Sequence, residues 1–170
     1  MRMLAKSLLA SLAFALGIGL ADPASAQEPA APVQLAARSV EGRAFDLRQL
    51  RGRVVLLMYW STDCAVCRDK MHELRLNAAG WRGKPFELVL VSVDRRLQDL
   101  QDYERILEWT VPASLRFTQL WTGSPGYSDN LGRPAQLPMA YVIDPQGRVV
   151  ERFAGRIPAE AWDRIADLLP

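Results

Sequence analysis

Apolar residues are arranged along the chain in two kinds of pattern. Residues 54–60 and 86–94 are largely apolar runs, which are typical of central strands buried on both faces. The segment between them carries apolar residues at the spacing of one helix face, namely Cys67, Met71, Leu74 and Ala78. A strand, a helix and a second strand in this order predict a βαβ unit with parallel strands.

The rest of the chain divides into shorter elements. Turn residues at 40–43 and 145–147 each separate two short strands and predict two β-hairpins. Helical spacing predicts two more helices over 95–110 and 159–169, and a short strand is expected at 115–117. The expected hairpin strands are residues 33–38, 44–47, 139–144 and 148–153. The order of elements predicts an α/β domain with a mixed sheet.

The first 26 residues have the parts of an export signal. Arg2 and Lys6 form a positive start, residues 7–21 are apolar, and residues 24–26 are a small-residue cleavage site. The apolar part is shorter than the roughly 20 residues that span a bilayer. We therefore expect a cleaved signal, with membrane anchoring through an uncleaved signal as the alternative.

One domain is expected to follow the signal at residues 1–26. Residues 27–32 are rich in Pro and Ala and predict a flexible leader, while residues 33–170 are long enough for one domain with a sizeable core. Removal of the signal leaves a net charge of +1 and no basic cluster, so the charge gives no case for nucleic-acid binding. Export implies an oxidising compartment, and we expect the periplasm.

The only two cysteines, Cys64 and Cys67, follow the first long strand. Two thiols at this spacing can form a disulfide or share a soft metal ion. A disulfide that closes so short a ring removes little entropy from the unfolded chain, so it is a poor structural staple and a good redox pair. Because Cys64 lies where the strand passes into a helix, the helix N-terminus favours its thiolate. Cys64 is therefore the expected nucleophile and Cys67 the resolving partner.

Four stretches in this order resemble the thioredoxin-like fold and, within it, the exported TlpA/ResA type of thiol-disulfide protein. They are residues 50–60, the Cys64-Ala65-Val66-Cys67-Arg68 motif, residues 91–94 and residues 137–148. The resemblance implies a central mixed β-sheet with helices on both faces and an N-terminal β-hairpin. It also implies a protein thiol:disulfide oxidoreductase that uses no cofactor and no metal.

The same resemblance implies partners. They are client proteins with disulfides and a membrane thiol-disulfide electron donor. It favours the reducing direction, with clients such as apocytochromes awaiting haem or copper-site cysteines awaiting metal. It further implies that Pro138 follows a cis peptide bond and packs beside the cysteines, so that the backbone of Leu137 meets an extended client segment. An ordinary trans proline is the alternative.

Three residues near the cysteines are expected to modulate the pair. Asp63 stands where relatives usually carry an aromatic residue, and we expect it to be the helix N-cap, although a carboxylate there disfavours a thiolate. Lys70 stands where many relatives carry Glu. A solvated surface lysine is the favoured interpretation, and stabilisation of a thiolate is the alternative. Trp60, at the end of the preceding strand, is the third of these residues.

Other functions were weighed for the same cysteines. Cys64 and Cys67 could hold Cu(I) with Met71 or Met139 as a soft third ligand. A peroxidase of the peroxiredoxin type is set aside, because its motif places Thr and Pro where this chain has Ser61 and Leu57. A redox-inactive thioredoxin-like binding protein also stays open, since the usual Glu and Trp beside the cysteines are missing.

Overall fold

The structure is a computed structural model that describes residues 31–169, so the predicted export signal and most of the predicted leader lie outside the described residues. Its centre is a five-stranded sheet in the order β5-β4-β3-β7-β8. The strands are β3 (Val54–Trp60), β4 (Phe86–Ser92), β5 (Thr118–Trp121), β7 (Met139–Ile143) and β8 (Val149–Ala154). Strands β3, β4 and β5 run parallel, and β7 and β8 run antiparallel to their neighbours. The predicted mixed sheet is confirmed.

Strand β3 is the centre of the sheet. All seven of its residues are buried, and it lies between β4 and β7, with Leu57 beside Val89 on one side and Tyr141 on the other. Half-buried and exposed residues alternate along β8, as is typical of an edge strand with one face toward solvent. A continuous apolar run is thus needed only where both faces and both edges of a strand are covered.

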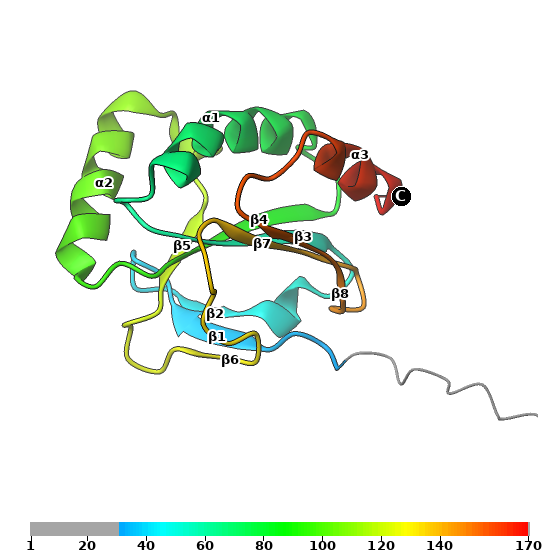
Figure 1. Ribbon diagram of the computed structural model, residues 1–170, viewed down its shortest axis with the longest axis horizontal. Coiled ribbons are helices and arrows are strands. Elements are labelled where there is room, and N and C mark those ends of the chain that lie inside the picture. Colours follow the sequence, from blue (N-terminus) through cyan, green and yellow to red (C-terminus); the bar gives the residue numbers. More distant parts are fainter. Residues whose placement is uncertain (1–30, 170) are drawn as a thin grey trace, which may run out of the picture.

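The three α-helices pack on one face of this sheet. They are α1 (Ala65–Gly80), α2 (Leu97–Thr110) and α3 (Glu160–Asp167). Figure 1 shows α1 and α3 above the sheet, with α2 beside them. Leu74 from α1, Leu100 from α2 and Ile165 from α3 join one core cluster with Leu56 and Met58 of β3. In the described part of the chain, no helix is long and apolar enough to cross a membrane.

The opposite face of the sheet is covered by the N-terminal segment. Strands β1 (Leu35–Arg38) and β2 (Ala44–Asp46) form the predicted hairpin, and β6 (Ser128–Asp129) adds a third strand to it. The short 3-10 helix η1 (Leu47–Leu50) follows, and its Leu47 packs with Leu57 and Tyr59 of β3. The sheet therefore has helices on both faces, as predicted, but they are unequal. The three α-helices share one face, and the short helix η1 lies on the other (Figure 1).

The strand expected at 115–117 is wrong by a few residues. The 3-10 helix η2 (Ala113–Leu115) occupies its start, and β5 begins at Thr118, which pairs with Val89 of β4. Because the buried residue Gln119 is polar, β5 does not show the continuous apolar pattern of a buried strand. Its side chain is accommodated because its amide oxygen accepts a hydrogen bond from the Trp60 indole at 3.2 Å.

Candidate functional site

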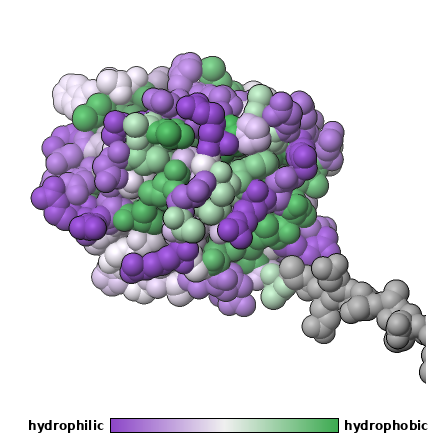
Figure 2. All heavy atoms as spheres, in the orientation of Figure 1, coloured by the Kyte–Doolittle hydropathy of each residue, from purple (hydrophilic) through white to green (hydrophobic). Residues whose placement is uncertain are grey.

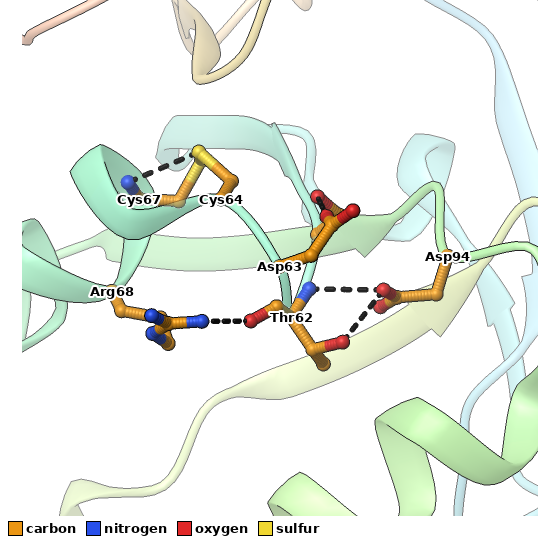
Figure 3. The surroundings of a disulfide bond; sticks show 7 residues. Thr62, Asp63, Cys64, Cys67, Arg68 and Asp94 are labelled. Carbon is orange, nitrogen blue, oxygen red and sulfur yellow. Dashed lines mark hydrogen bonds between the residues drawn. A yellow bond between two sulfur atoms is a disulfide. The ribbon is translucent and has the colours of Figure 1, made fainter.

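Cys64 and Cys67 form a disulfide at the start of α1, with their Cα atoms 5.2 Å apart. Cys64 is the N-cap residue of the helix, and its sulfur accepts the Cys67 backbone N–H at 3.1 Å (Figure 3). Cys67 is fully buried, whereas Cys64 is only partly buried. An incoming sulfur atom therefore meets Cys64 first.

The loop that leads into Cys64 is held from two sides at Thr62. Asp94, just after β4, accepts hydrogen bonds from the Thr62 backbone N–H at 2.9 Å and from its hydroxyl at 2.8 Å. The Ser92 hydroxyl donates to the other Asp94 oxygen at 2.6 Å, and the Arg68 guanidinium donates to the Thr62 carbonyl. Figure 3 shows Thr62 between Asp94 and Arg68. The buried Asp94 carboxylate and the Arg68 guanidinium thus both hold the loop that positions Cys64 relative to the sheet.

Sequence reasoning gave Asp94 no role of its own. The residue ends the 91–94 stretch that carries part of the family resemblance. The signal available was a single acidic residue directly after a buried strand, on the same sheet edge as the cysteines. Since neighbouring parallel strands end at that edge, such a residue is a candidate to hold the adjoining loop.

The predicted N-cap role of Asp63 is wrong. Because α1 begins at Ala65, Cys64 occupies the N-cap position, and its own sulfur takes the hydrogen bond that a capping side chain would accept. The exposed Asp63 carboxylate instead accepts the hydroxyl of Ser61. A negative charge therefore stands directly beside Cys64 and is not committed to the helix N-terminus.

Lys70 is buried, so the interpretation of a solvated surface lysine is also wrong. Only 7% of the residue is exposed, and its ammonium forms an ion pair with Glu73 at 2.7 Å. Glu73 also accepts the Trp162 indole N–H from α3. Burial alone would raise the pKa of Glu73, but these hydrogen bonds from Lys70 and Trp162 hold it below its ordinary value. Lys70 lies one turn beyond Cys67, with its charge shared with Glu73.

Trp60 is a core residue at the end of β3. It is fully buried, its indole N–H donates to Gln119, and its ring packs edge-on against Tyr103 with the ring centroids 4.9 Å apart. Its place in the same core cluster as Cys67 and Met58 means that it positions the strand end from which the cysteine loop starts.

The peptide bond between Leu137 and Pro138 is cis, as expected from the resemblance. Pro138 is buried, and its carbonyl accepts the Gly155 N–H at 2.8 Å. The partly buried side chains of Leu137 and Cys64 both pack against the core cluster on the helix-bearing face. Leu137 also forms part of the wall of a groove of about 800 Å³.

Three polar side chains in the lining of this groove, Tyr59, Tyr127 and Asp129, are hydrogen-bonded to one another in series. The Tyr59 and Tyr127 hydroxyls are 3.3 Å apart, and the Tyr127 hydroxyl donates to Asp129 at 2.6 Å. Burial raises the pKa of both tyrosines above the ordinary value, so both phenols are neutral near pH 7. The lining of the groove therefore combines these two neutral phenols with charged side chains, among them Arg95, Asp129 and Arg133.

The two methionines considered as soft metal ligands are core residues. Met71 is 2% exposed and Met139 is 1% exposed, and they belong to core clusters on opposite faces of the sheet. Within residues 31–169, no group of three or more His, Cys, Asp or Glu side chains is placed to hold a metal ion.

A cysteine pair at a helix N-terminus, a cis-proline segment and this mixed sheet together define a protein of the thioredoxin-like class. The sequence profile of the AhpC/TSA family matches residues 26–152, and the chain belongs to this family.

Individual relatives agree with that class. The chain is 24% identical over 116 residues to the thiol-disulfide oxidoreductase ResA of Bacillus thuringiensis (strain Al Hakam), a match that covers 68% of this chain and 63% of the relative's length. Among solved structures it is similar to a putative thiol:disulfide interchange protein DsbE from Chlorobium tepidum. That similarity has a TM-score of 0.62 at 26% identity, over 78% of this chain and 90% of the other.

StoA from Bacillus subtilis has the same fold. Its TM-score is 0.60 at 18% identity, over 81% of this chain and 99% of the other chain.

Proposed function

We propose that this protein is an exported thiol:disulfide oxidoreductase that reduces disulfides in client proteins through Cys64 and Cys67. The observation that carries the proposal is the Cys64–Cys67 disulfide, which joins a partly exposed and a fully buried sulfur at the N-terminus of α1. The printed names of ResA and of the DsbE-type structure support the same activity.

The reaction begins with the reduced pair. The Cys64 thiolate attacks one sulfur of a client disulfide, and the other client sulfur leaves as a thiolate and takes up a proton. Cys67 then attacks Cys64 in the mixed disulfide, which forms the Cys64–Cys67 bond and releases the second client sulfur. The client gains two electrons and the pair loses two. A dithiol donor at the membrane returns two electrons to the pair.

The cis-proline segment is proposed to hold the client. The backbone of Leu137 would align an extended client segment by strand addition, with Pro138 shaping the turn beside it. The groove beyond Leu137 would take client residues next to the reacting cysteine, because its tyrosine hydroxyls offer hydrogen bonds without charge.

The charges around the pair act in opposite directions. Asp63 is proposed to disfavour the Cys64 thiolate, because it places an exposed carboxylate beside it. The buried cation of Lys70 is proposed to favour a thiolate, to the extent that Glu73 leaves its charge uncompensated. Trp60 is proposed to act by holding the end of β3 in place.

The first residues of the sequence support a proposal for the compartment in which the protein works. Residues 1–26 are proposed to be a cleaved export signal and residues 27–32 a flexible leader before the thioredoxin-like domain at 33–170. The domain would then work in the periplasm, where its clients would be apocytochromes or proteins whose cysteines await copper. In that oxidising compartment it needs the membrane donor to stay reduced.

Trapping of client proteins tests the proposal. In cells that express the Cys67→Ala variant, the mixed disulfide has no resolving thiol, so Cys64 should stay bonded to clients that appear as reducible bands after acid quenching and thiol alkylation. The Cys64→Ala variant is the matched control and should trap far less. If Cys67→Ala traps no more than the control, the chain does not exchange disulfides with proteins in this way.

A further inference from the structure

A second cavity lies away from the cysteines. It has a volume of about 1030 Å³ and lies between α1 and α2, above the starts of β4 and β5. Arg53, which precedes β3, forms part of its wall, whereas Cys64 follows β3. Because seven residues of extended strand span about 23 Å, this wall of the cavity is remote from the disulfide. Figure 2 shows strongly hydrophilic residues over the α2 end of the molecule.

The lining of this cavity carries more cations than anions, and they come from separate segments. Two of its acidic residues are already paired, Glu87 with Arg53 at 3.2 Å and Glu41 with Arg43 at 3.6 Å. Three further arginines in the lining have no carboxylate within ion-pair distance among residues 31–169, namely Arg75, Arg82 and Arg116. Cations from α1, from the turn after it and from the segment between η2 and β5 therefore line one cavity.

Three polar side-chain atoms of the wall have no hydrogen-bond partner among residues 31–169. Three buried side-chain atoms in the described part of the chain have no hydrogen-bond partner: Nε of Arg53, Nε of Arg75 and Oε1 of Glu104. All three residues line this cavity. Buried polar groups in folded proteins are nearly always paired, so these two donors and one acceptor are groups that a ligand in the cavity could satisfy. Arginine side chains are long enough to turn such donors toward a bound anion.

The surroundings of Glu104 raise the pKa of its carboxyl, which reduces its repulsion of an anion in the cavity. Burial and the nearby charge of Glu41 raise its pKa to about 7, against a hydrogen bond from Gln119 and the charges of Arg75 and Arg116. Near neutral pH its carboxyl can therefore carry a proton and donate it to an anion. The Glu104 carboxyl then adds little repulsion toward a bound anion.

We propose that this cavity binds a compact polyanion, a small molecule with two or more carboxylate or phosphate groups. Its volume is at the upper end of the range for small-molecule sites. The arginines stand on separate elements, which suits a ligand with anionic groups at more than one end, and the planar guanidinium pairs well with both carboxylate and phosphate. This site is separate from the proposed redox function.

Binding of two probes to the purified protein tests the proposal. Citrate and inorganic pyrophosphate distinguish carboxylate from phosphate ligands and are titrated by calorimetry at constant ionic strength. The Arg75→Gln variant should bind the preferred probe about tenfold more weakly, since it loses one charge-assisted hydrogen bond. The matched control is Arg152→Gln, which removes the same charge from exposed β8, and its affinity should match that of the unchanged protein.

The pH dependence of binding gives a second readout. Because Glu104 is neutral below about pH 7 and both probes also lose protons between pH 6 and pH 8, the pH effect of Glu104 is measured against the Glu104→Gln variant. The affinity of the unchanged protein relative to that variant should fall by up to about tenfold between pH 6 and pH 8. The proposal is overturned if neither probe binds in the millimolar range, or if Arg75→Gln and Arg152→Gln bind alike.

Discussion

Asp94 is expected to contribute strongly to stability. Its carboxylate accepts three side-chain or backbone hydrogen bonds, two from Thr62 and one from Ser92, and the residue is 9% exposed. A hydrogen bond to a charged group contributes about 1.5–3 kcal/mol, and the partly exposed Thr62 regains some of this from water. The Asp94→Ala variant should therefore lose about 3 kcal/mol of unfolding free energy.

The conservative variant separates hydrogen bonding from other causes. In Asp94→Asn the amide oxygen can still accept from Thr62, and the Ser92 hydroxyl can accept from the amide NH₂, so the loss should be about 1 kcal/mol. Both are measured by urea unfolding of the oxidised protein. Asp99→Ala is the control, because its ion pair with Arg96 lies on the surface and is screened by solvent, so its removal should change the unfolding free energy little. A loss for Asp94→Ala that does not exceed that of Asp94→Asn would refute the reasoning.

Three further outcomes are expected. Asp63→Asn should make the reduction potential of the pair less negative and Lys70→Gln more negative, by about 10–30 mV each, since they remove opposite charges near the thiolate; shifts of the same sign would contradict this. The raised pKa of Glu104 implies a contribution to stability that is full below about pH 4.5 and is lost as pH rises through about 7, so Glu104→Gln should flatten the pH profile of unfolding while exposed Glu108→Gln should not. Leu74→Ala should cost about 2–5 kcal/mol in denaturant unfolding, because Leu74 is fully buried; a loss under 1 kcal/mol would show a loosely packed helix face.

The elements that the sequence predicted best are those whose residues all lie in the same environment. Strands β3 and β4 are buried on both faces, so their apolar runs predicted them directly. Strand β5 was misplaced because buried Gln119 is polar, and its compatibility with the core depends on Trp60, which is 59 residues away in sequence. A local pattern carries no information about such a partner.

The candidate site, like the fold, was predicted correctly only in part. The position of Cys64 at the start of α1 followed from the strand-to-helix pattern. The predicted N-cap, Asp63, was wrong by one residue, because Asp63 and Cys64 both carry side chains able to accept a hydrogen bond and the outcome depends on the exact residue at which the helix begins. Lys70 appeared solvated because its burial depends on Glu73 and on Trp162 from α3, which pack together only in the folded chain.

The central claim is that Cys64 and Cys67 form a reducing dithiol. The equilibrium reduction potential of the purified protein, measured in dithiol and glutathione buffers, tests it most directly. We predict a value near or below about −220 mV, where the pair gives electrons to client disulfides. A value near −120 mV would contradict the account, because it would mark an oxidant whose thiolate is stabilised despite the carboxylate of Asp63.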